Sequence, residues 1–294
     1  MSAGDRTGVD APAAGPPPAG GAREVASLLR SRRERLQPAD VGLPGSARRR
    51  TPGLRREEVA QLAGISTTYY TFLEQGRDLN PSRSVLDALA RALRLGRTEG
   101  LHLHELVRGV PAGPTAATRG AVETVPSALV DLVERLDPHP TYVTGRSWDV
   151  LAANRAARAL WTDWPALPLE QRNVLWWTFM DPAARTVLVE WESEASAQLA
   201  RFRTAAARHP DDIEFVSLIE LLLDGCAEVR EWWPRHDVAP LSSGRKLIRH
   251  PTLGDLEFQH LVLQLADNPD QKLVTFAAEQ QLQARIAQLL NTGS

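Results

Sequence analysis

The side chains best suited to hydrogen-bonding and stacking chemistry lie on one short predicted helix. The segment from Leu54 to Gly76 has the pattern of two short helices joined by a tight turn. Gly64 falls where that turn needs a positive φ, and Ser66 is placed to cap the second helix. The residues predicted to pack between the helices are Val59, Ala63, Ile65, Tyr70 and Leu73. The outward residues, with Ser66 at the start, are Thr67, Thr68, Tyr69, Thr71 and Phe72, and such a face fits the major groove of DNA.

Arginines surround this motif in the way that phosphate contacts require. They are Arg48, Arg49, Arg50, Arg55, Arg56, Arg77 and Arg83. From Arg23 to Leu106 the chain holds 15 Arg against 10 Asp and Glu, whereas the remainder is acidic and the net charge is −2. A structural helix pair without a nucleic-acid role is the alternative, and this local basic surplus weighs against it.

Two groups of motifs resemble known regulators. The run from Arg49 to Ser66, followed by Tyr69-Tyr70 and Leu73–Arg77, resembles the XRE-type helix-turn-helix regulators. The C-terminal half is similar to the ligand-binding domain of the MmyB-like subgroup at Trp148–Asn154, Arg172-Asn173, Phe179–Pro182, Trp191 and His250–Gly254. The resemblance implies a bacterial transcription regulator with a lambda-repressor-like domain of five helices. It also implies a PAS-like C-terminal domain that senses a small, lipidic molecule.

Phe72 departs from the family pattern, which usually has Arg at this position. An apolar ring can reach only a thymine methyl group or pack against the protein. We therefore expect a different operator preference.

Composition divides the chain into four parts. Residues 1–22 consist mainly of Ala, Gly and Pro and are expected to be a disordered tail. Residues 23–109 form the predicted DNA-binding domain, and the Pro- and Gly-rich residues 110–120 form a linker. Residues 121–294 form the predicted ligand-binding domain.

The C-terminal half is predicted to mix strands and helices. Expected strands cover 141–144, 148–151, 245–249, 256–265 and 272–278, and expected helices include 154–161 and 182–208. The last three strands form a meander, and the whole pattern favours an α+β fold.

All eight Trp residues lie in the C-terminal half, where large rings can line an apolar pocket. The candidate ligand contacts are Trp148, Asn154, Arg172, Asn173, Trp176, Trp177, Phe179, Trp191, Arg245 and His250. Aromatic residues also fill cores without binding anything. For His250, a hydrogen bond that fixes the turn before Gly254 is favoured over a ligand contact.

Several function classes are disfavoured. The chain has no nucleophile elbow, phosphate-binding Gly-rich loop or paired-His helix motif, so we expect neither an enzyme nor a metal site. The single Cys226 excludes a disulfide framework. No apolar run is long enough to span a membrane, which predicts a cytoplasmic, nucleoid-associated protein.

The sequence thus predicts a homodimeric regulator that binds a double-stranded DNA operator and senses a small apolar ligand. No cofactor is expected other than a bound fatty acid or a similar apolar molecule. The alternative is a constitutive DNA-binding regulator whose C-terminal domain mediates protein interaction or dimerisation without a small ligand. An enzyme carrying a borrowed DNA-binding domain would require a cluster of titratable groups that the sequence does not display.

Overall fold

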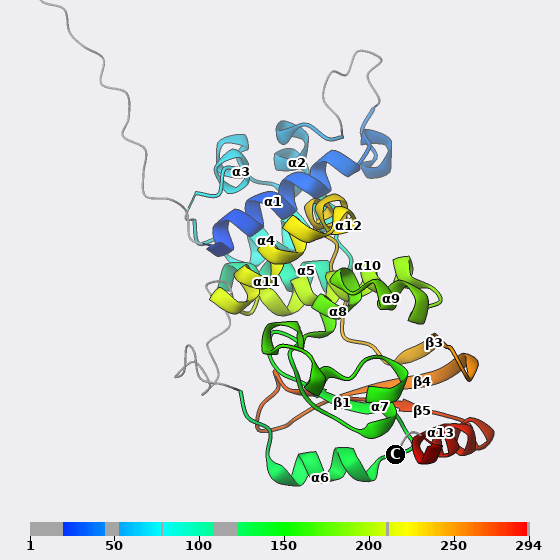
Figure 1. The fold of residues 1–294 in the computed structure, drawn as a ribbon. Coiled ribbons are helices and arrows are strands. Elements are labelled where there is room, and N and C mark those ends of the chain that lie inside the picture. Colours follow the sequence, from blue (N-terminus) through cyan, green and yellow to red (C-terminus); the bar gives the residue numbers. More distant parts are fainter. Residues whose placement is uncertain (1–19, 45–52, 78, 109–122, 210–211, 293–294) are drawn as a thin grey trace, which may run out of the picture.

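The computed structural model describes residues 20–44, 53–77, 79–108, 123–209 and 212–292 (Figure 1). Arg48, Arg49 and Arg50, the predicted linker and residues 1–19 of the predicted tail lie outside the described residues. The first helix begins at Gly20, three residues before the predicted start of the DNA-binding domain. It packs against the fifth helix, and a Cβ atom at Gly21 would lie 2.8 Å from the Leu106 carbonyl oxygen, so this close contact favours glycine despite its low helix propensity.

The described residues between 20 and 108 form five α-helices, as predicted. They are α1 (Gly20–Arg35), α2 (Arg56–Ala63), α3 (Thr67–Glu74), α4 (Arg83–Ala92) and α5 (Arg97–Arg108), with a short 3-10 helix η1 (Pro38–Val41) after α1. Their shared core includes Leu29, Val59, Tyr70, Leu89 and Leu103, all fully buried. Each helix contributes one apolar stripe, which confirms the amphipathic pattern of the sequence.

Two glycines allow this packing. Gly64 ends α2 with a φ of +67°, the left-handed conformation that the predicted turn requires. Gly53 has a φ of +70°, and a Cβ atom there would lie 2.3 Å from the carbonyl oxygen of Arg33. The chain can therefore pass the end of α1 closely enough to enter α2.

A five-stranded antiparallel sheet organises the C-terminal part. Its strands are β1 (Thr141–Thr144), β2 (Val150–Ala153), β3 (Gly244–His250), β4 (Gly254–Gln264) and β5 (Lys272–Ala277). Their order is β2-β1-β5-β4-β3, so the predicted meander β3-β4-β5 is present and β1 joins it through β5. Thr141 pairs with Thr275, and Lys246 pairs with Phe258. The predicted α+β class is confirmed.

Helices surround this sheet and separate it from the DNA-binding part (Figure 1). They are α6 (Ser127–Arg135), α7 (Arg155–Leu160), α8 (Val174–Met180), α9 (Pro182–Val187), α10 (Trp191–Ala206), α11 (Ile213–Gly225), α12 (Ala227–Trp232) and α13 (Gln280–Thr292). α6 packs on β1 and β2, with Val133 against Val143 and Leu273. The layer of α8 to α12 lies between the sheet and the first five helices.

The prediction of a single helix over 182–208 is wrong, because this segment forms two helices, α9 and α10, with a non-helical stretch between them. Leu188 at this break is buried and pairs with Ile248 in an isolated bridge to β3. Contact with the sheet thus interrupts a stretch whose local sequence suits a continuous helix. Among the described residues, no helix is both long and apolar enough to cross a membrane.

Candidate functional site

The outward face of α3 is the first candidate site. Thr67 and Thr68 are exposed, while Tyr69, Thr71 and Phe72 are half-buried along the same helix. The Ser66 hydroxyl accepts a hydrogen bond from the Tyr69 amide at 3.1 Å, so Ser66 caps α3 as predicted. The helix presents short polar side chains on a surface that the rest of the described domain leaves open.

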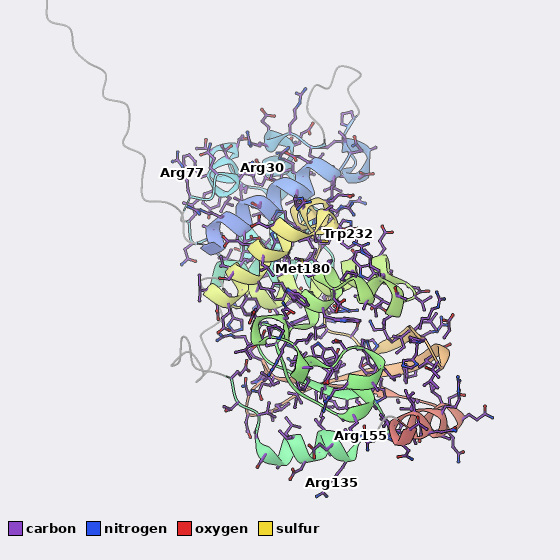
Figure 2. The ribbon with its side chains drawn as sticks, viewed as in Figure 1. Arg30, Arg77, Arg135, Arg155, Met180 and Trp232 are labelled. Atoms are coloured by element: carbon purple, nitrogen blue, oxygen red, sulfur yellow. The ribbon has the colours of Figure 1, made fainter. Side chains whose placement is uncertain are left out.

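Phe72 supports an arginine. The Arg77 guanidinium lies over the Phe72 ring, 3.9 Å from its centroid, at the end of α3 (Figure 2). Such a cation–π contact restricts where the charge sits. Phe72, the residue that departs from the family pattern, thus positions Arg77, another residue predicted to contact DNA. The spacing of the residues in the sequence did not reveal this contact.

The other predicted phosphate-contacting arginines differ in their surroundings. Arg55 and Arg83 are exposed beside the starts of α2 and α4. Arg56 donates from its Nε to the Glu74 carboxylate at 2.6 Å. Its guanidinium therefore belongs to a structural cluster as well as to the outer surface.

Glu74 is the centre of that cluster, which the sequence interpretation missed. Glu74 is 1% exposed, and its carboxylate accepts hydrogen bonds from Arg33 Nε at 2.5 Å, Arg56 Nε at 2.6 Å and the Tyr70 hydroxyl at 3.0 Å. Burial alone would raise the pKa of Glu74, but the bonds from Arg33 and Arg56 outweigh it and lower the pKa. One carboxylate thereby ties α1, α2 and α3 together and fixes the recognition helix.

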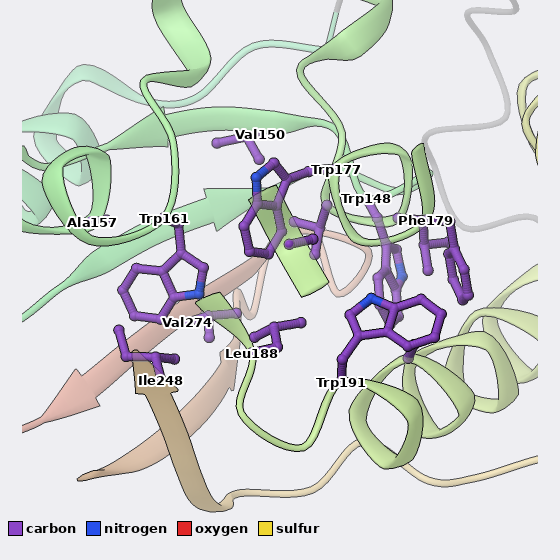
Figure 3. Close-up of a cluster of buried hydrophobic side chains, with 14 of the residues drawn as sticks. Trp148, Val150, Ala157, Trp161, Trp177, Phe179, Leu188, Trp191, Ile248 and Val274 are labelled. Carbon is purple, nitrogen blue, oxygen red and sulfur yellow. The ribbon is translucent and has the colours of Figure 1, made fainter. Parts of the chain in front are cut away.

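Four predicted ligand residues meet in the aromatic core of the C-terminal part (Figure 3). Trp148, Trp177, Phe179 and Trp191 belong to one buried cluster, and Trp176 packs at its edge. Phe179 and Trp191 meet edge-on with ring centroids 6.1 Å apart. The structure therefore brings together the aromatic half of the predicted site.

Hydrogen-bond donors inside this core lack partners. Among the described residues, the indole N–H groups of Trp148, Trp164 and Trp177 are buried without an acceptor, whereas Trp191 donates to the Thr178 carbonyl at 2.9 Å. A buried donor without a partner costs about 1–3 kcal/mol. Acceptors supplied from outside the chain would remove this cost.

Trp148 also has an unusual backbone. Its φ is +72°, which is costly for a bulky residue and is associated with functional sites. The Asn173 side chain donates to the neighbouring Ser147 carbonyl at 2.8 Å and helps hold this conformation. The predicted strand over 148–151 is therefore wrong at its start, because β2 begins only at Val150.

The two predicted asparagines act as helix caps. Asn154 Oδ1 accepts from the Thr141 and Ala157 amides at 3.0 Å, and Asn173 Oδ1 accepts from the Leu175 amide at 2.9 Å. Both side chains are buried within the fold. They position the segments that carry the aromatic residues, and their contact with a ligand stays a prediction.

The remaining polar candidates form hydrogen bonds or ion pairs with other protein groups. Arg172 donates to the carbonyls of Leu167 and Pro165 at 2.9 Å, and Arg245 pairs with Glu257 on the exposed sheet surface at 2.6 Å. His250 Nδ1 accepts from the amides of residues 252 and 253 at 3.2 Å. These hydrogen bonds are those expected of a turn-fixing residue, and contact of His250 with a ligand stays a prediction.

Trp191 additionally borders a surface hollow of about 550 Å³. Trp232, Glu190, Glu192 and Arg235 line the same hollow. The hollow lies beside α10 and α12, and two residues that line it, Trp191 and Trp232, also contact Phe179 in the core.

A helix-turn-helix with an exposed second helix, joined to a second domain of sheet and helices, is the architecture of a DNA-binding transcription regulator. Residues 24–103 match the family model described as a helix-turn-helix domain. Residues 125–290 match the model of the MmyB-like transcription regulator ligand binding domain. The chain therefore belongs to the MmyB-like transcription regulators, as its motifs predicted. No curated protein matches it.

Proposed function

We propose that this regulator reads a specific operator through α3 and responds to a small apolar ligand held in the aromatic core. The exposed face of α3, fixed from behind by Glu74, is the observation that carries operator recognition. A homodimer would place two such helices on half-sites about 34 Å apart, or a multiple of that distance. A small rotation between protomers would then abolish simultaneous contact.

The unpartnered indole donors support the ligand part of this proposal. Trp148, Trp164 and Trp177 belong to the buried apolar cluster, and each offers an N–H group with no acceptor in the described residues. A fatty acid would complement these side chains, since its chain is apolar and its head accepts hydrogen bonds. Displacement of Trp148 from its left-handed conformation would be one route from ligand binding to a change in packing.

Base reading makes a specific prediction for α3. We expect Thr68→Ala and Tyr69→Ala to weaken binding to an operator selected from random duplexes by about 10- to 100-fold, and binding to random DNA much less. Arg49→Ala should weaken both and flatten the salt dependence, because it removes a phosphate contact. Thr252→Ala, at an exposed threonine of the C-terminal part, is the matched control. Equal losses on operator and random DNA for the Thr68 and Tyr69 variants would contradict base reading.

Native mass spectrometry of the purified protein, followed by denaturing extraction, tests ligand and dimer together. We expect a dimer that releases an acyl compound. A ligand-free dimer would instead favour the alternative, a constitutive DNA-binding regulator whose C-terminal part binds a protein. One observation supports that alternative: α11 exposes Ile213 (69%), Val216 (39%) and Leu221 (45%) along one side.

A further inference from the structure

Charged and polar side chains join the DNA-binding part to the C-terminal part. Glu24, Arg32 and Arg35 lie on α1, Arg203 lies on α10, and His236 and Asp237 follow the short 3-10 helix η5 (Trp233–Arg235). These six residues are called the interdomain latch below. Figure 1 shows α12, which leads into η5, beside α1.

Arg203 is the buried centre of the latch. It is 4% exposed and donates from Nη1 to Glu24 Oε2 at 3.1 Å and to His236 Nδ1 at 3.0 Å. It also donates to the Trp233 carbonyl and stacks over the Trp233 ring at 3.6 Å. Burial lowers the pKa of Arg203 to about 10, which still leaves it charged at neutral pH. A buried charge needs a partner, and here the carboxylate comes from the other part of the chain.

The turn after η5 completes the contact with α1. His236 has a φ of +53° and ends η5 in the left-handed conformation. Arg32 donates to the His236 carbonyl at 2.9 Å, and Arg35 donates to the Arg235 carbonyl and to Asp237 at 2.9 Å. Carbonyls at a helix end carry partial negative charge, so two arginines of α1 complement them.

The latch is continuous with the aromatic core. Phe202 precedes Arg203 on α10, and its ring meets Trp148 edge-on with centroids 6.0 Å apart. Trp232 precedes η5, and its ring lies 5.9 Å from that of Trp191 (Figure 2 labels Trp232). Movement of Trp148 would therefore displace Phe202, the neighbour of Arg203 in the sequence, and movement of Trp191 would displace Trp232, which directly precedes η5.

We propose that the interdomain latch couples the state of the aromatic core to the orientation of the DNA-binding domain. This inference rests on the proposed ligand sensing and names the element that transmits it. With the latch closed, α1 is held on α10 and η5, and α3 is presented in one orientation. A ligand that favours a different packing of Trp148 against Phe202 shifts Arg203 and weakens the hold on Glu24. The two states differ in latch contacts, which is what coupling between two sites requires.

The test uses the full-length protein and a variant that combines Glu24→Gln with Asp237→Asn. Both side chains are partly exposed, so their neutralisation should leave each domain folded. The matched control combines Glu257→Gln with Asp255→Asn, which removes two charges from exposed ion pairs on β4. Hydrogen exchange followed by mass spectrometry should show residues 233–239 exchanging about tenfold faster in the latch variant. Protection equal to that of the control would overturn the latch.

A second measurement separates the latch from ligand sensing. Dodecanoate is added to lipid-stripped protein, and operator affinity is compared with and without it. We expect a change of at least about fivefold in the wild type and the control, and a change near onefold in the latch variant, which still binds the operator. An unchanged response in the latch variant would overturn the coupling role. No response in the wild type would instead contradict the proposed fatty-acid sensing, while the exchange experiment would still decide whether the latch holds the domains.

Discussion

Glu74→Ala is expected to destabilise the helix-turn-helix by about 3–5 kcal/mol, which is the cost of breaking a buried ion pair from one side. The substitution leaves Arg33, itself buried, and the Tyr70 hydroxyl without their shared acceptor. It also releases Arg56 from the inner side of α2. Because a small domain is stable by only about 5–15 kcal/mol, a large fraction of its stability would be lost. Urea unfolding followed by far-ultraviolet circular dichroism should show an early transition as the five helices melt.

Two variants sharpen this prediction. Glu74→Gln keeps the shape and one acceptor oxygen but removes the charge, so its loss should be smaller than that of Glu74→Ala. Glu57→Ala removes an exposed glutamate from the first turn of α2 and should cost less than about 1 kcal/mol. If Glu74→Ala and Glu57→Ala unfolded at the same urea concentration, the Glu74 cluster would not be what fixes α3.

The DNA-binding fold could be predicted because its signals are local. A glycine at the turn and a serine at the following cap belong to one short segment, and the structure places Gly64 and Ser66 in those roles. The cluster at Glu74 could not be predicted in the same way. Its partners include Arg33, which lies 41 residues away, and arginines near a helix-turn-helix suit phosphate contact equally well.

The C-terminal part shows the same limit more strongly. Alternation of apolar residues located four of the five strands closely, but the start of β2 depended on a left-handed Trp148 held by Asn173. The break before α10 depended on a bridge between Leu188 and β3. Both features are decided by contacts between distant segments, and such contacts override local propensity.

Burial of His102 predicts a strong loss of stability in acid. His102 lies on α5 and is 2% exposed. Burial, and then the charge of Arg203, lower its pKa to about 4. In the unfolded chain its pKa is near 6.5, so the unfolded state binds more protons between these two values. Stability from His102 is therefore complete above pH 6.5 and is lost as the pH falls towards 4. The expected loss between pH 7.5 and 4 is about 3 kcal/mol.

His102→Phe should remove this part of the acid dependence, since phenylalanine cannot take up a proton. The ring also replaces an Nδ1 atom that is buried without a hydrogen-bond partner among the described residues, so stability at pH 7.5 should not fall. Free energies of unfolding from urea titrations at the two pH values provide the comparison. His104 lies on the same helix and is hydrogen-bonded to Asp87, and His104→Gln should lose as much stability between the two pH values as the wild type. If the free energy of unfolding fell equally with pH in His102→Phe and His104→Gln, other groups would cause the acid sensitivity. Protonation of His102 would then not destabilise the fold.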